Sequence, residues 1–117
     1  MTIDDYQDEA MRTASGMDYR KYKKTDAVTG LLINGLMGLN GEAGECIDIL
    51  KKHLFQGHEL DREHLAEELG DVLWYIAVSA RALGYDLSDI VKMNVVKLIN
   101  RYPDGFDPER SIHRQNQ

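Results

Sequence analysis

Apolar residues recur every three or four positions along most of this chain, which is the spacing of amphipathic α-helices. One stripe, within about residues 26–54, comprises Leu36, Leu39, Ala43, Ile47, Leu50 and Leu54. A second, within 61–83, comprises Leu65, Leu69, Val72, Ile76, Ala80 and Leu83. The alternation typical of β-strands is absent, and no proline precedes Pro103. The pattern therefore predicts an all-α protein.

Capping residues and glycines predict where the helices begin and end. We expect the main helices over about residues 3–15, 26–54, 61–83 and 88–102. Thr2, followed by Asp5, caps the first of them, and Asp61 caps the third. Short connections make consecutive helices antiparallel neighbours, so the expected fold is a four-to-five-helix bundle with antiparallel core helices. A single domain covers 1–117, with 103–117 as an extended C-terminal tail.

The charge and the cysteine content narrow the functional classes. Acidic residues outnumber basic ones by 20 to 14, for a net charge of −6, which disfavours non-specific nucleic-acid binding. The one cysteine, Cys46, excludes an intrachain disulfide. Neither a signal-peptide pattern nor an apolar run of membrane-spanning length is present. We expect a cytoplasmic protein without nucleic-acid or membrane partners.

Two pairs of carboxylates flank the two long apolar stripes. Glu42 and Glu45 lie about 60° apart around the second predicted helix. Glu68 and Asp71 repeat this spacing on the third, where Glu67 points away toward solvent. If the two helices pack antiparallel, four acidic groups converge in one partly buried space.

Carboxylates gathered in this way repel one another and raise each other's pKa. A hard divalent cation removes that cost, and an all-oxygen ligand set suits Mg²⁺ or Mn²⁺. For a single pair, a solvated acidic face is the better interpretation. Two pairs that both flank a core favour a metal site.

Glycines also recur inside the second predicted helix, at Gly35, Gly38, Gly41 and Gly44. Each costs roughly 1 kcal/mol relative to alanine in a helix interior. The run indicates close approach of another helix or of a ligand. A kinked or broken helix start near residue 40 explains it equally well.

The fourth predicted helix carries basic and amide side chains on one face. Asn94, Lys97 and Arg101 fall within about 60° of one another. Two cations and an amide in a line suit a polyphosphate. Alone, they are better explained as a solvated face, but beside a four-carboxylate cluster the phosphate interpretation is favoured.

These motifs, in this order, resemble the MazG-like branch of the all-α nucleoside triphosphate pyrophosphohydrolases. That family carries Glu-x-x-Glu, a spacer and Glu-x-x-Asp, which "EAGE" and "ELGD" match here. The flanking segments "KKHLFQGH", "EELGDVLWY" and "MNVVKLINRYPDGF" match as well, and "DYQDEAMRTA" resembles the first helix of small, stand-alone and phage-type members. The resemblance covers nearly the whole chain.

The resemblance implies Mg²⁺-dependent hydrolysis of a nucleoside triphosphate between its α and β phosphates, with Mn²⁺ as a possible substitute. It implies that Glu42, Glu45, Glu68 and Asp71 are catalytic metal ligands, with Glu45 also a candidate to activate water. Its phosphate- and sugar-binding positions match Asn94, Lys97 and Arg101, and its base-contacting positions match Tyr6 and Gln7. Tyr6 is explained equally well as core packing. Base and sugar preference stay open.

Several other residues have more than one interpretation. In the tail, one interpretation is that Arg110 or Arg114 contacts the phosphates of the substrate. The alternative is that the tail has no role in binding. Three histidines between the two carboxylate pairs, His53, His58 and His64, are better explained as solvated side chains than as zinc ligands. Trp74 and Ile99 lie off the core stripes, which indicates a subunit interface and a homodimer or homotetramer, as is typical of the family.

Two rival functions remain at this point. A di-metal carboxylate bundle with a redox role uses Glu-x-x-His motifs, and here the fourth position is Glu45 or Asp71. A non-catalytic helical interaction protein would have no need to keep all four acidic positions. Both are less favoured than the pyrophosphohydrolase.

Overall fold

The computed structural model describes residues 1–14 and 26–114, and this part of the chain is helical without a strand. The helices are α1 (Ile3–Ala14), α2 (Ala27–Phe55), α3 (Arg62–Ala82), α4 (Leu87–Arg101) and α5 (Pro108–Ile112). The all-α prediction is confirmed, and the predicted boundaries within this part agree to within about two residues. The predicted end of the first helix, at residue 15, lies outside the described residues.

Local capping explains where the helices begin. The Thr2 N–H donates to Asp5 Oδ2 at 2.8 Å, and the Asp5 N–H donates to Thr2 Oγ1 at 3.0 Å. The Asp61 carboxylate accepts a hydrogen bond from the His64 N–H at 3.0 Å, at the start of α3. Both predicted caps are confirmed, and each satisfies backbone donors that the first helical turn leaves unpaired.

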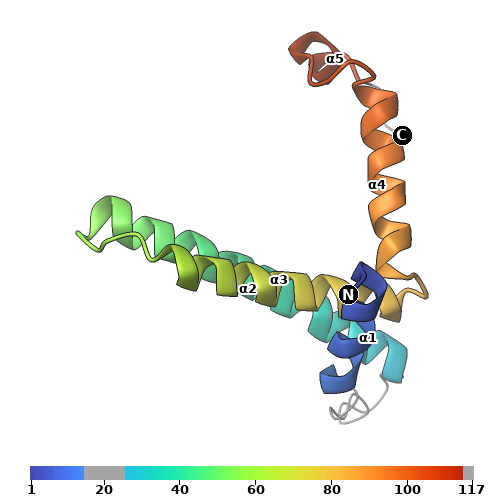
Figure 1. The fold of residues 1–117 in the computed structure, drawn as a ribbon, viewed down its shortest axis with the longest axis horizontal. Coiled ribbons are helices and arrows are strands. Elements are labelled where there is room, and N and C mark those ends of the chain that lie inside the picture. Colours follow the sequence, from blue (N-terminus) through green and yellow to red (C-terminus); the bar gives the residue numbers. More distant parts are fainter. Residues whose placement is uncertain (15–25, 115–117) are drawn as a thin grey trace.

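The helices α2 and α3 form a long antiparallel hairpin (Figure 1). At Gly35 an added Cβ would overlap Ser79 Oγ, and at Gly38 it would overlap the Tyr75 ring. These two glycines therefore let α3 approach α2, which confirms the predicted helix contact for them. Gly41 has open space where a Cβ would stand. α2 is continuous through residue 40, so the glycines do not break the helix.

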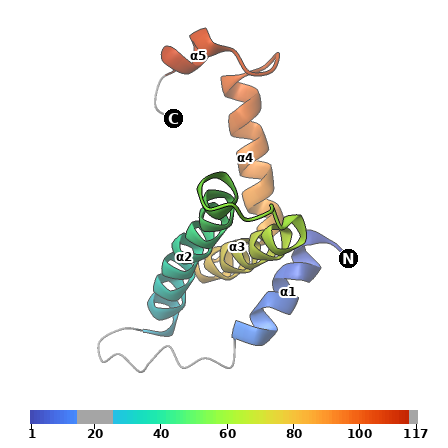
Figure 2. The same cartoon turned by 90° about the vertical axis from the view of Figure 1, so that its left-hand side faces the viewer.

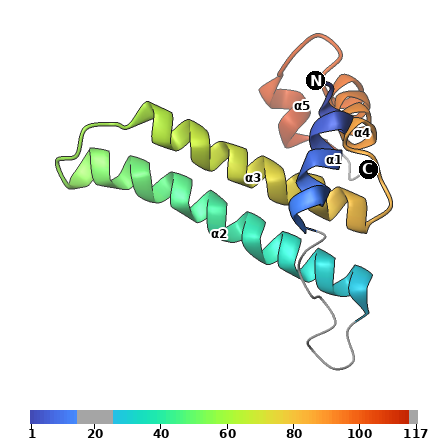
Figure 3. The same ribbon diagram turned by 60° about the horizontal axis from the view of Figure 1, so that its bottom comes forward.

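A small core lies where α1 crosses the C-terminal part of α3 (Figure 3). Its buried apolar residues are Ala10, Ala14, Ala77, Val78, Ala80 and Leu87. Trp74 packs against this core, and its Nε1 donates to Thr13 Oγ1 of α1 at 2.9 Å. The α1 helix thus covers part of Trp74, and the subunit interface predicted at this residue stays a prediction.

The apolar stripe of α2 lies largely in solvent, contrary to the prediction that it forms the core, whereas the stripe of α3 contributes Ala80 to the core and Ile76 to the residues packed against it. Leu36 is 52% exposed, Ile47 62% and Leu54 60%. The reason is that α2 turns its glycine flank, and not this stripe, toward α3. Among the residues that the structure describes, the hairpin is consequently a single layer of helices with one uncovered apolar side.

The helix α4 does not pack along α3, so the prediction of antiparallel neighbours is wrong for this pair. It starts beside α1 and the end of α3 and then runs away from the hairpin (Figures 1 and 2). Every residue from 91 to 100 is exposed. The connection at residues 83–86 turns the chain at Gly84, whose φ is +84°, and hydrogen bonds to α1 hold the start of α4.

Candidate metal and nucleotide site

Three of the four predicted carboxylates meet where α2 faces α3. Glu42, Glu68 and Asp71 each offer a carboxylate oxygen, and these oxygens all lie within 4.8 Å of one another. Glu42 and Glu68 are half-buried, whereas Asp71 is exposed. The three-residue spacing places Glu68 and Asp71 on one flank of α3, and the antiparallel pairing brings Glu42 opposite them.

The electrostatics of this carboxylate cluster show mutual repulsion. The pKa of Glu42 is raised, first by a hydrogen bond with the Glu68 carboxyl group and then by partial burial. The negative charges of Glu68, Asp71 and Glu45 raise it further. A raised pKa means that a proton relieves the repulsion between these groups. A divalent cation would relieve it more completely, so the donor set fits a hard metal ion.

Glu45 stands beside the carboxylate cluster and not within it. Its side chain is exposed, but its charge contributes to the raised pKa of Glu42. The prediction that Glu45 is a fourth ligand stays a prediction.

His64 is solvated, as predicted, and it also approaches the carboxylate cluster. Its Nε2 lies 3.4 Å from Glu68 Oε1, and its side chain is 51% exposed. The spacing of four residues between His64 and Glu68 was the available signal, since such pairs are neighbours on a helix surface.

Tyr6 lies near Asp71 of the carboxylate cluster, whose charge acts on its phenol group. Its hydroxyl group lies 3.5 Å from the Gly70 carbonyl oxygen. Burial and the charge of Asp71 raise the pKa of the Tyr6 phenol. Tyr6 also packs against the small core, as its core-packing interpretation predicts, and its contact with a base stays a prediction.

Gln7, unlike Tyr6, is buried and hydrogen-bonded to backbone groups of other segments. It is fully buried, and its amide donates to the carbonyl oxygens of Ala77 and Tyr85, each at 3.1 Å. Its Oε1 accepts a hydrogen bond from the Leu87 N–H at 2.9 Å. A contact with a base would require this amide to give up these bonds. Contact between Gln7 and a base stays a prediction, whereas its link between three helices is visible.

The cations of α4 lie far from the carboxylates of the same chain. Asn94, Lys97 and Arg101 share one helix face, as predicted. About 16 Å of helix separate Asp71 from the end of α3, and about 15 Å more, in another direction, separate the start of α4 from Lys97. The single chain therefore does not bring the predicted phosphate-binding and metal-binding groups together.

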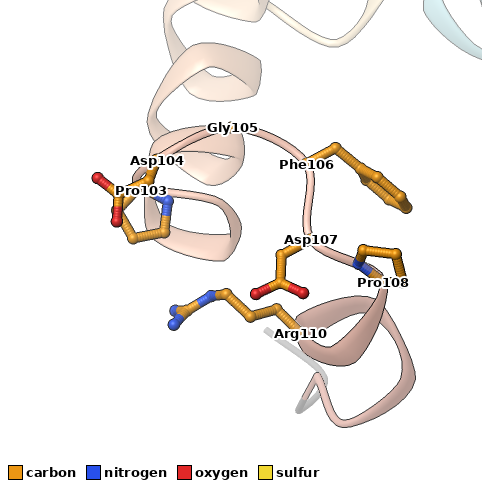
Figure 4. Close-up of a pocket in the computed structure, with 7 residues that line it drawn as sticks. All are labelled: Pro103, Asp104, Gly105, Phe106, Asp107, Pro108 and Arg110. Atoms are coloured by element: carbon orange, nitrogen blue, oxygen red, sulfur yellow. The ribbon is translucent and has the colours of Figure 1, made fainter.

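The C-terminal segment folds back on the end of α4. Arg110 Nε donates to the Arg101 carbonyl oxygen at 2.7 Å, and the rings of Tyr102 and Phe106 lie 5.2 Å apart. Arg110 lines a pocket of about 350 Å³ formed by this turn (Figure 4). The guanidinium group caps the helix here, and its contact with a phosphate, like that of Arg114, stays a prediction.

Comparison with known proteins gives the class of this protein. The MazG nucleotide pyrophosphohydrolase domain matches residues 34–106, a range that contains all four acidic positions and the polar face of α4. The "Gene 37 protein" of Mycobacterium phage L5 is 38% identical over 109 residues, which cover 90% of this chain and 92% of that protein. This chain belongs to the MazG nucleotide pyrophosphohydrolase family.

No solved structure matches the chain. Within the described residues, no helix combines the length and apolar character that crossing a bilayer needs.

Proposed function

We propose that this protein is a divalent-metal-dependent nucleoside triphosphate pyrophosphohydrolase that forms homo-oligomers in the cytoplasm. It cleaves the bond between the α and β phosphates and releases a nucleoside monophosphate and pyrophosphate. One observation carries the proposal: three carboxylates that repel one another converge within the region matched by the pyrophosphohydrolase domain. This arrangement is suited to a metal and a polyphosphate together.

Mg²⁺ is the proposed cofactor, with Mn²⁺ as a substitute. Glu42, Glu68 and Asp71 would hold the ion, with Glu45 as a further ligand. The support is chemical, since oxygen-only ligands favour hard cations and an antiparallel pair of helices presents three of them together. When bound, such an ion offsets phosphate charge and lowers the pKa of water.

The other residues of the proposed site act on the substrate. Glu45 is exposed beside the cluster and would orient the attacking water or accept its proton. Lys97 and Arg101, with Asn94, would bind the phosphates and sugar and stabilise the charge that develops on the departing pyrophosphate. Tyr6 would contact the base, and Gln7, the next residue of α1, would be the second base-contacting residue.

The test is pyrophosphate release from a panel of ribo- and deoxyribonucleoside triphosphates, with Mg²⁺ and with a chelator. We expect Mg²⁺-dependent pyrophosphate release and little turnover of nucleoside diphosphates. Orthophosphate as the first product would contradict cleavage between the α and β phosphates. Complete inactivity across the panel would instead favour a non-catalytic interaction protein, and electron transfer without hydrolysis would favour the redox bundle.

A further inference from the structure

Glu68 contacts an imidazole as well as another carboxyl group of the cluster. Its carboxyl group forms a hydrogen bond with that of Glu42, and it is one of the three carboxylates whose oxygens lie within 4.8 Å of one another. In addition, His64 Nε2 lies 3.4 Å from Glu68 Oε1. This proposed metal ligand therefore has a polar neighbour to which the proposed function gives no role.

His64 reaches one member of the carboxylate cluster and not all of them. Among the described residues, the group of mutually close ligand atoms comprises Glu42, Glu68 and Asp71, and no nitrogen of His64 belongs to it. A ligand of the same ion would lie close to all the other ligands, because each stands about 2.1 Å from a bound Mg²⁺. The position of His64 therefore fits a residue that holds a ligand, and not a ligand itself.

The first turn of α3 fixes the point from which His64 reaches Glu68. The His64 N–H donates to the Asp61 carboxylate at 3.0 Å, so the backbone of His64 is part of the helix cap. Four residues separate His64 from Glu68, and side chains at this spacing are neighbours on a helix surface. The Glu68 side chain is 16% exposed, whereas that of His64 is 51% exposed. The imidazole thus contacts the cluster from its solvent side.

A carboxylate that binds a metal ion must keep one orientation. A glutamate side chain has several rotatable bonds, and fixing them costs conformational entropy. An N–H group that donates to one carboxylate oxygen restricts this rotation and leaves the other oxygen for the ion. In metal sites, loss of such a contact behind a ligand typically lowers the metal affinity by about 10- to 100-fold.

We propose that His64 is a positioning residue, whose Nε2–H group donates to Glu68 Oε1 and holds this carboxylate in the orientation that binds the divalent cation. The proposal rests on the proposed function for the presence of the cation. The donor is the neutral imidazole with its proton on Nε2, which adds no positive charge beside the ion. The distance of 3.4 Å exceeds the ordinary range of about 2.7–3.2 Å by a few tenths of an ångström, which a small rotation of the exposed ring removes.

Three variants separate this role from a general effect of removing a histidine. His64→Leu removes the donor, whereas His64→Gln keeps an N–H donor but loses the imidazole nitrogens that bind metals. His58→Leu is the matched control, because His58 is also exposed and lies outside the carboxylate cluster. Exposed pairs four residues apart on a helix contribute little to stability, so all three variants should melt close to the wild type in the presence of a chelator.

The measurement is the binding of Mn²⁺ to the nucleotide-free protein, followed by the electron paramagnetic resonance signal of free Mn²⁺. Titrations at about pH 8 keep imidazoles ordinarily neutral. We expect His64→Leu to weaken Mn²⁺ binding by about 10-fold or more, His64→Gln to retain most of the affinity, and His58→Leu to match the wild type.

Several results would overturn the proposal. Equal Mn²⁺ affinity in His64→Leu and the wild type would show that the contact has no effect on the ion. An equal loss in His64→Leu and His64→Gln would show that the imidazole itself binds the metal. A markedly lower melting temperature of His64→Leu in chelator would assign the residue to folding instead.

Turnover separates this proposal from the proposed function. In His64→Leu the Mg²⁺ concentration for half-maximal pyrophosphate release should rise by about 10-fold, with kcat at saturating Mg²⁺ close to that of the wild type. If the wild type releases no pyrophosphate, the proposed function fails, and the Mn²⁺ affinities of the variants still decide the role of His64. Unchanged affinities in an active enzyme would overturn the role of His64 alone, and a wild type that binds no Mn²⁺ would overturn both.

Discussion

The backbone N–H of Leu87, the first residue of α4, donates a hydrogen bond to the buried Oε1 of Gln7 in α1. The Gln7 side-chain Nε2 donates to the carbonyl oxygens of Ala77, in α3, and of Tyr85, in the connection that follows α3. One side chain therefore joins three helices at the point where the chain turns away from the hairpin. The direction in which α4 leaves depends on a residue some eighty positions earlier in the sequence.

Gln7→Ala should destabilise the protein strongly. The substitution leaves the Leu87 N–H without its acceptor and removes a donor from the carbonyl oxygens of Ala77 and Tyr85, and each orphaned buried group costs about 1–3 kcal/mol. We expect the free energy of unfolding in urea to fall by roughly 3 kcal/mol or more. Gln56→Ala, at an exposed position, is the matched control and should change stability by less than about 0.5 kcal/mol. Similar denaturation curves for both variants would show that the amide network contributes little.

Two glycines of α2 should respond to alanine in opposite directions. In Gly38→Ala the new methyl group overlaps the Tyr75 ring, so the helices must separate and we expect a loss of about 1–3 kcal/mol. Gly41→Ala meets no atom within 4 Å and gains up to about 1 kcal/mol of helix propensity. Thermal unfolding of the two variants checks this. A lower melting temperature for Gly41→Ala would mean that another surface approaches the helix there.

Glu68 and Glu67 are adjacent glutamates on different sides of α3. Variants at the two positions therefore test whether the position of a carboxylate matters or only its negative charge. Glu68→Gln removes a charge from the carboxylate cluster, and we expect Mg²⁺-dependent turnover to fall by about 100-fold or more. Glu67→Gln should change turnover little, because this exposed side chain lies about 100° away around α3. Kinetics over a range of Mg²⁺ concentrations give the comparison. Equal losses would mean that the cluster acts only through its overall negative charge.

Asp4 should make the stability of the protein depend on pH in the acid range. Hydrogen bonds from the Ser88 hydroxyl group and then from the Ser88 N–H lower the pKa of the Asp4 carboxyl group. The stabilisation is therefore complete above the unfolded pKa of about 3.9 and is lost as the pH falls through the lower, folded pKa.

The Asp4→Asn variant tests this linkage. It should be less stable than the wild type at neutral pH, and the difference should shrink as the pH falls below about 4. Ser88→Ala removes the hydroxyl donor and should reduce the pH dependence in the same direction. Free energies of unfolding at several pH values give the comparison, and a difference that is constant with pH would exclude Asp4 as its source.

Features that depend on local chemistry could be read from the sequence. The Thr2 and Asp61 caps were predictable because capping involves residues only three positions apart. The proximity of Glu68 and Asp71 was predictable because the helix repeat places them on one flank. The convergence with Glu42 followed once a short connection made α2 and α3 antiparallel.

Tertiary structure alone decided how the helices turn about their own axes and where they lead. The apolar stripe of α2 indicated a surface that avoids water, but the fit of Gly38 against Tyr75 turned another flank toward α3. The burial of Gln7 and its hydrogen bond from the Leu87 N–H join residues eighty positions apart, so they could not be read from the sequence. Periodicity shows which side of a helix avoids water, whereas the segment that covers it, in the same chain or in another, depends on contacts between residues distant in sequence.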